Sequence, residues 1–174
     1  MSAPQQSLSP EFAAGMREVT LQGLAREVET TKKVLGAVLD SNRDFRLDPK
    51  GRTAWDLAWH LASCDVQMTD EIADQKFVME PRFKDEPKNI AEMVKWYDSN
   101  MNRAIGRVRA MTPEQLCTPV EFYGVFNMPA VFYLGFVNNH SIHHRGQLAA
   151  YLRPMGSKVP SIYGGSADEP WPPQ

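Results

Sequence analysis

Residues 139–147 read Asn-His-Ser-Ile-His-His-Arg-Gly-Gln and contain three of the four histidines of this chain. Imidazole is the commonest metal ligand among protein side chains. Residues four apart on a helix are offset by only about 40° around its axis, so His140 and His144 would project from one face, one turn apart. His143 is rotated about 100° from His144 and is placed at the flank of that face.

The fourth histidine, His60, closes the segment Trp55-Asp56-Leu57-Ala58-Trp59-His60. It would complete a site of three histidines if its helix packs beside the helix of His140 and His144. A site with three protein ligands leaves one coordination position open, which is typical of catalytic rather than structural metal sites. Both candidate helices carry their histidines in otherwise apolar stripes: Leu57, His60, Cys64 and Met68 on one, and Tyr133, Val137, His140, His144, Leu148 and Tyr151 on the other.

The composition is that of an ordinary globular protein. The chain has 174 residues, 43% of them hydrophobic and 23% charged, which favours a single domain with a substantial core. A net charge of −2 gives no electrostatic reason to expect nucleic acid or an anionic membrane as a partner. The polar start lacks the pattern of a signal peptide, and no apolar run reaches the roughly 20 residues of a bilayer span. With two cysteines, Cys64 and Cys117, a reduced, cytoplasmic protein is expected.

Helical periodicity recurs four times along the chain. The expected helices cover about 11–39, 54–76, 88–111 and 127–152, with Thr53 and Asp56 as a capping box before the second and Asn127 as the N-cap of the last. Thr112-Pro113 would start a separate short turn. The pattern predicts an all-α four-helix bundle with long connections at 40–52 and 112–127. A single domain over 1–174 is expected, with a core of about 11–153 and a proline-rich tail over 154–174.

Two known motif patterns fail at the histidines. A zinc-protease helix needs glutamate directly after its first histidine, where this chain has Ser141. A di-iron carboxylate bundle needs glutamate three residues before histidine, where this chain has Leu57 and Val137.

The segment His-Ser-Ile-His-His-Arg-Gly-Gln-Leu-Ala-Ala-Tyr-Leu-Arg at 140–153, followed by Val-Pro-Ser-Ile-Tyr-Gly at 159–164, resembles the C-terminal signature of the DinB-like (damage-inducible DinB/YfiT) proteins. Residues 53–60 are similar to the second-helix histidine segment of that family. The resemblance implies a four-helix bundle that holds a divalent metal, commonly zinc or nickel, through His60, His140 and His144. It also implies frequent homodimers, and relatives that are S-transferases or isomerases using low-molecular-weight thiols such as bacillithiol or mycothiol.

Such a site allows more than one function. A divalent metal with an open position can activate a thiol for attack on a small electrophile, or a water for hydrolysis. We therefore expect a metal-dependent thiol S-transferase with a small-molecule substrate, and keep as alternatives a hydrolase, a non-catalytic metal-binding stress-response protein and, more weakly, a haem or metal carrier. The sequence assigns no catalytic residue.

Several residues near the histidines have open roles. Gln147 and Tyr151 follow His144 near its face and would contact substrate or simply pack. Cys64 is expected to be a small buried core residue rather than a fourth ligand. Asp56 would cap its helix rather than orient His60, and Arg145 would be a structural or interface charge.

Overall fold

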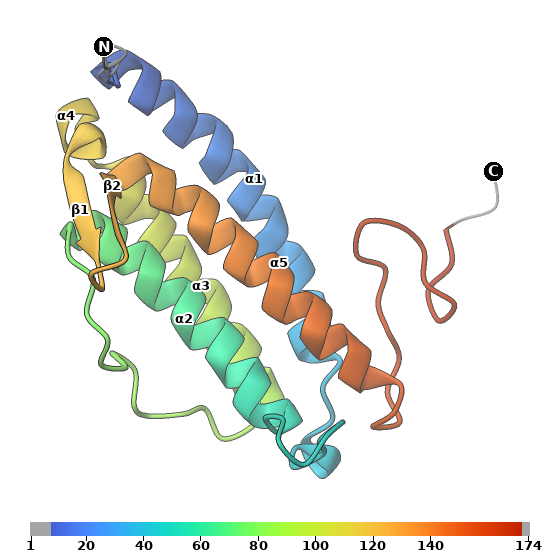
Figure 1. The fold of residues 1–174 in the computed structure, drawn as a ribbon. Helices are drawn as coiled ribbons and strands as arrows, with labels where there is room; N and C mark the ends of the chain where they lie inside the picture. Colours follow the sequence, from blue (N-terminus) through green and yellow to red (C-terminus); the bar gives the residue numbers. More distant parts are fainter. Residues whose placement is uncertain (1–7, 172–174) are drawn as a thin grey trace, which may run out of the picture.

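Residues 8–171, which the computed structural model describes, fold around four long helices packed as a bundle (Figure 1). The predicted all-α four-helix bundle is confirmed. The long helices are α1 (Pro10–Gly36), α2 (Ala54–Asp74), α3 (Ile90–Arg109) and α5 (Tyr133–Leu152). Shorter elements are η1 (Asp40–Asn42), α4 (Pro113–Cys117), η2 (Ala130–Phe132) and a hairpin of β1 (Pro119–Phe122) and β2 (Phe126–Pro129).

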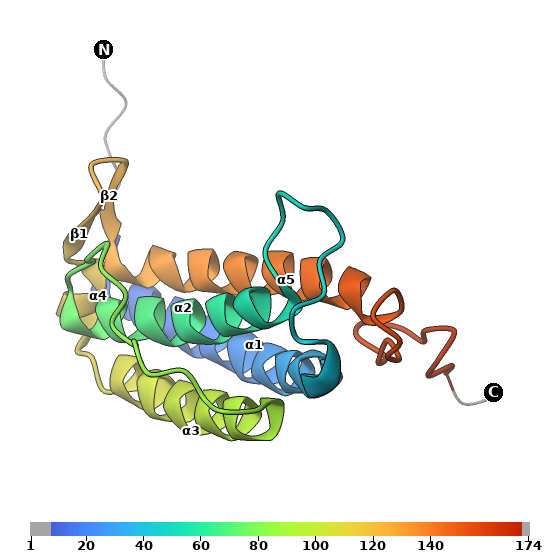
Figure 2. The same ribbon diagram turned by 90° about the horizontal axis from the view of Figure 1, so that it is seen from below.

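Each long helix packs against two others, so that the four surround one core. Helices α1 and α2 each contact both α3 and α5 (Figure 2). The side chains that fill the space between them are almost entirely apolar and fully buried; they include Leu21, Leu57, Leu61, Met101 and Leu148. Burial of this apolar surface is the main favourable term in folding, and it fixes α2 beside α5.

The signals that start the helices act as expected. The Thr53 hydroxyl accepts a hydrogen bond from the Asp56 backbone N–H at 2.9 Å, and the Asp56 carboxylate accepts one from the Thr53 N–H at 3.4 Å. This reciprocal capping box fixes the beginning of α2, six residues before His60. Thr112 caps α4 in the same way, with Pro113 at its first position.

The start of the last helix was predicted wrongly. Asn127 is not an N-cap: it lies in β2, opposite Glu121 of β1, and α5 begins only at Tyr133. The hairpin turns through Tyr123 and Gly124, whose φ angles of 53° and 73° suit the twist of a tight hairpin. Val120 and Phe122 before that turn and Phe126 after it are residue types that favour strands over helix.

The other helix ends differ from expectation by a few residues. Helix α1 ends at Gly36 rather than near Leu39, and α2 ends at Asp74, where Gln75 takes the left-handed conformation of a helix C-terminus. Helix α3 is shorter than the expected 88–111 at both ends. The hairpin and α4 lie at the end of the bundle where α1 and α5 begin, and the 37–53 connection lies at the other end (Figure 1).

Residues 154–171 continue beyond α5 without helix or strand. They are held to the bundle by Arg145, whose buried guanidinium lies 2.5 Å from a Glu27 carboxylate oxygen and also contacts the Tyr163 hydroxyl. Tyr163 itself donates a hydrogen bond of 2.7 Å to Glu27. The arginine of the histidine-rich segment therefore joins α1, α5 and the tail, as the structural charge that the sequence predicted. The outer limits of the predicted domain, at residues 1 and 174, lie outside the described residues.

A search of the described helices for a membrane-spanning segment found none that combines sufficient length with sufficient hydropathy.

Candidate metal centre

Packing of α2 against α5 brings three histidines together. His60 on α2 faces His144 on α5, with 3.2 Å between their Nε2 atoms. The ring centroids of His140 and His144 are 4.4 Å apart, and those of His60 and His140 are 5.3 Å apart. His143 is exposed on the flank of α5, with its ring beside that of His144. The predicted convergence of His60, His140 and His144 is therefore present in the fold.

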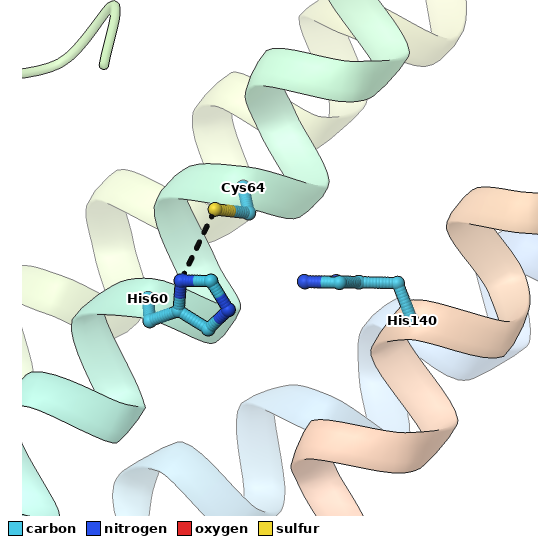
Figure 3. A group of neighbouring side chains, drawn as sticks. All are labelled: His60, Cys64 and His140. Carbon is cyan, nitrogen blue, oxygen red and sulfur yellow. Dashed lines mark hydrogen bonds between the residues drawn. The ribbon is translucent and has the colours of Figure 1, made fainter. Parts of the chain in front are cut away.

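Cys64 lies beside His60, one turn along α2 (Figure 3). Its Sγ atom is 3.3 Å from His60 Nδ1, and His140 approaches the pair from α5. His60, Cys64 and His140 each offer a ligand atom within 4.8 Å of the other two, so this cluster could hold a metal ion. The expectation that Cys64 is a buried core residue is incomplete, because its side chain is only partly buried.

Asp65 orients His140, and the sequence analysis did not single it out. Its fully buried carboxylate lies 2.8 Å from His140 Nδ1 and accepts a hydrogen bond of 3.1 Å from the Tyr97 hydroxyl. Burial raises the pKa of Asp65, and the hydrogen bonds from His140 and Tyr97 oppose that shift. In its ionised form the carboxylate can only accept, which places the proton of His140 on Nδ1 and leaves a lone pair on Nε2. The signal in the sequence was an acidic residue on the buried face of an amphipathic helix, five positions after a candidate ligand.

Gln147 orients His144 through a hydrogen bond to its Nδ1 atom, as Asp65 orients His140. The Gln147 side-chain oxygen lies 3.2 Å from His144 Nδ1, one turn further along α5. An amide oxygen accepts, so this contact places the proton of His144 on Nδ1 and its lone pair on Nε2. Histidines that bind metals usually have their second nitrogen held in this manner.

Burial keeps the facing imidazoles neutral. It lowers the pKa of His60 to about 4, and repulsion from Arg52, His144 and His140 acts in the same direction. Burial likewise lowers the pKa of His144 to about 4, helped by the neighbouring His140. Burial raises the pKa of the Cys64 thiol to about 11, with the Asp65 charge adding to the effect. At neutral pH two of these side chains are therefore uncharged imidazoles, the form that ligates a metal.

The spacing of His60 and His144 fits a small divalent ion. Two nitrogens bound to one tetrahedral zinc at 2.0–2.1 Å would lie about 3.3 Å apart. The separation of 3.2 Å between the Nε2 atoms of His60 and His144 matches this value. The pair of Cys64 Sγ and His60 Nδ1, at 3.3 Å, is somewhat shorter than the roughly 3.6 Å expected for sulfur and nitrogen on one zinc.

A cavity of about 440 Å³ opens directly beside the histidines. Its walls come from α2, from the connection between α2 and α3, from the hairpin and from His140 of α5. Trp59, Phe83, Phe122 and Tyr123 make much of the surface apolar, while His60, Cys64 and His140 lie at one end. A pocket with apolar walls and a few convergent polar groups is the usual form of a small-molecule site.

Two other residues named from the sequence have structural roles. The Asp56 side chain is engaged in the capping box of α2, as predicted. The buried Tyr151 donates its hydroxyl hydrogen to the Arg52 carbonyl at 3.2 Å and does not line the cavity.

Comparisons with known proteins agree with this architecture. Residues 24–148 match the DinB superfamily. The uncharacterized protein YrdA of Bacillus subtilis (strain 168) is 26% identical over 144 residues, which cover 82% of this chain and 85% of YrdA. The crystal structure of a DinB-like protein from Bacillus cereus ATCC 10987 has a TM-score of 0.72 at 26% identity, over 84% of this chain and 97% of that protein. The DinB-like protein YjoA of Bacillus subtilis shares the fold, with a TM-score of 0.67 at 16% identity over 82% of this chain and 96% of YjoA. The chain therefore belongs to the DinB superfamily.

Proposed function

We propose that this protein holds one divalent metal ion, zinc or nickel, through His60, His140 and His144, and transfers a low-molecular-weight thiol to small electrophiles. The observation that carries the proposal is the approach of His60 Nε2 to His144 Nε2 at 3.2 Å, at the end of the cavity. A bound divalent metal would make a coordinated thiol react as its thiolate at neutral pH.

The hydrogen bonds and protonation states around the imidazoles support the three-histidine set. In this set every Nδ1 faces an acceptor: Asp65 for His140, Gln147 for His144, and the Cys64 sulfur for His60. All three Nε2 atoms are then available as ligands. A set of Cys64, Nδ1 of His60 and His140 would also leave the imidazoles hydrogen-bonded, because the Nε2–H of His60 would donate to His144 Nε2, but it would require a thiol whose pKa burial raises to about 11 to lose its proton.

The chain's own groups would prepare the transfer. The three imidazoles would hold the metal that binds the thiol, and Asp65 would orient His140. The aromatic walls of the cavity would contact the apolar part of the electrophile and exclude water. A carbon–sulfur bond forms as the bond from that carbon to its leaving group breaks. The leaving group departs with its electron pair, and the thiol proton passes to solvent.

We expect His60→Ala, His140→Ala and His144→Ala each to lose stoichiometric metal, because removing one of three ligands leaves too few donors to retain the ion. Wild type, reconstituted with zinc or nickel and dialysed, should hold about one ion per chain. Elemental analysis measures the content, and circular dichroism checks that the helices persist. Cys64→Ser is the matched control and should retain the metal. Loss in Cys64→Ser with full retention in His144→Ala would instead assign His60, Cys64 and His140 as ligands.

Asp65→Ala should weaken zinc binding by about 10–100-fold, because His140 loses the acceptor that orients its ring. Asp65→Asn keeps an acceptor oxygen and should lose less. Competition with a chromophoric chelator measures the affinity, and Asp56→Asn, which keeps its cap, is the control. Unchanged affinity in a folded Asp65→Ala protein would refute the positioning role.

Thiol conjugation should require both the metal and the thiol. We expect the metal-loaded protein to accelerate the reaction of bacillithiol or mycothiol with an aryl chloride electrophile. The rate is measured from the loss of the aryl chloride and the appearance of the conjugate. His144→Ala should reduce the rate by about 100-fold or more, since a metal supplies several kcal/mol of stabilisation. Ester hydrolysis without thiol would favour the hydrolase alternative. Full metal content with neither activity would favour the non-catalytic stress-response alternative.

The homodimer implied by the family resemblance is also proposed, with support from an exposed aromatic cluster beside the hairpin. Phe126 and Phe136 are 42% and 37% exposed, and their rings lie within 6.3 Å of each other. Light scattering of the purified chain should give twice the monomer mass, and Phe136→Ser should reduce it towards the monomer. A monomeric wild type at micromolar concentration would contradict the dimer.

A further inference from the structure

A buried carboxyl group lies at the end of the cavity away from His60. His60, Cys64, Gln67 and Glu71 follow one another along α2 at steps of four, three and four residues, so they share one face of the helix. All four line the cavity. With a rise of 1.5 Å per residue, Glu71 is about 10 Å further along the helix axis than Cys64. Along this face of α2 the cavity wall thus continues from His60 and Cys64 to the Glu71 carboxyl, with Asp56 on the opposite side of His60.

Only one of the two Glu71 oxygens has a protein partner. Oε1 accepts hydrogen bonds from Gln67 Nε2 at 2.9 Å and from the Val78 backbone N–H at 3.3 Å. Oε2 is buried and has no hydrogen-bond partner in the part of the chain that the structure describes, and the whole residue is 0% exposed. A buried carboxylate oxygen without a donor is costly, so an unfilled acceptor in a cavity wall indicates a ligand that donates to it.

The Gln67 amide holds this carboxyl and the segment 78–82, which covers the cavity, in place. Its Nε2 also donates to the Val78 and Glu80 carbonyls, at 3.3 Å and 3.1 Å, and its Oε1 accepts from the Arg82 backbone N–H at 2.9 Å. Because Oε1 of Glu71 is tied to the same segment, the carboxyl cannot rotate without breaking these bonds. Oε2 is therefore an acceptor that is set in position before any ligand binds.

The charges around the cavity favour a cationic donor. Of the described residues that line it, two are acidic, Asp56 and Glu71, and none is lysine or arginine. Arg82 lies close enough to influence Glu71, but its guanidinium is directed to Asp74 at 2.7 Å and to Asp70 at 3.8 Å. Trp59, Phe83 and Tyr123 add aromatic faces, which attract ammonium groups as well as apolar groups.

We propose that Glu71 anchors the ligand of this cavity by accepting a hydrogen bond from a primary ammonium group, and that the ligand's apolar body lies along the aromatic walls towards His60. The site therefore selects small amines over the corresponding alcohols and carboxylates. If the protein transfers a thiol as proposed above, the amine belongs to the thiol or to the electrophile. This identification of the ligand rests on the proposed function, whereas the amine site itself does not.

The electrostatics of the empty cavity agree with this assignment. Burial raises the pKa of Glu71, although the hydrogen bonds from Gln67 and Val78 and the charge of Arg82 oppose the shift. A bound ammonium would add a counter-charge within the cavity. Hydrogen bonds between charged groups are about twice as strong as those between neutral groups, so the amine should be preferred over an alcohol of the same shape.

Phenethylamine, phenethyl alcohol and hydrocinnamate test this directly, because they share an aromatic body and differ in the head group. We would measure their binding to metal-free protein labelled at its methionine methyl groups, since Met68 and Met79 line the cavity and report where each probe lies. The amine should bind at least about tenfold more tightly than the alcohol, with the carboxylate weakest. Glu71→Gln should reduce amine affinity by about tenfold and change alcohol affinity less than about twofold. Glu80→Gln, a nearby exposed acid, should change neither.

Equal binding of amine and alcohol to wild type would overturn the proposal, as would an unchanged amine preference in Glu71→Gln. If Glu71→Gln does not fold, the ranking of the three probes on wild type decides the matter alone. Loss of metal binding with the amine preference intact would refute the proposed function and leave the Glu71 site standing. Intact metal binding without an amine preference would refute the Glu71 site and leave the proposed metal site standing.

Discussion

The hydrogen bond between Asp65 of α2 and His140 of α5, at 2.8 Å, is the contact on which the geometry of the centre depends. Apolar packing alone would allow the two helices to slide or rotate slightly, because hydrophobic contacts are not directional. A buried carboxylate that must meet one particular imidazole nitrogen allows little such movement. Leaving a buried polar group without its hydrogen-bond partner typically costs about 1–3 kcal/mol, and more for a charged group. The Asp65–His140 pair thus fixes the register that brings His144 opposite His60.

This pair is part of a polar layer that crosses the apolar core. Tyr97 of α3 donates to the second oxygen of Asp65, and the Ser141 hydroxyl on α5 contacts Thr31 of α1 at 3.2 Å. Every long helix therefore contributes a buried polar group at this level of the bundle. Buried polar groups cost stability unless all are satisfied, and when satisfied they specify one arrangement of the helices. The layer therefore orients the histidines within a bundle of mainly apolar contacts.

The sequence predicted those features that depend on local spacing. The pair of histidines four residues apart requires only that 133–152 be helical, and the Thr53–Asp56 capping box requires only three residues of separation. Two features escaped because their causes lie elsewhere in the chain. Asn127 looked like an N-cap, but pairing with Glu121 of the neighbouring strand takes it into the hairpin. Asp65 lies on the buried face of its helix, but its partner His140 is 75 residues away in the chain, so its role in orienting that histidine could not be predicted from local spacing. A ligand set with Cys64 also depends on ring orientation, which spacing does not determine.

Helices α2 and α5 contribute different parts of the site, and α2 contributes more of the cavity wall. Helix α5 contributes one imidazole, that of His140, to the cavity wall, and its next turn stabilises the fold through the buried Arg145 and the tail. Helix α2 contributes His60 and also the length of the cavity wall, from Cys64 through Gln67 to Glu71. The connection between α2 and α3 covers that wall, and Gln67 and Tyr123 bind it through the backbone groups of Val78, Glu80 and Arg82. Replacement of an exposed side chain such as Met79 would leave those bonds in place. Ligand selection can therefore change through α2 and residues 77–83 while the histidines of α5 keep their positions. This separation would allow the ligand of the cavity to change while the arrangement of the histidines is kept.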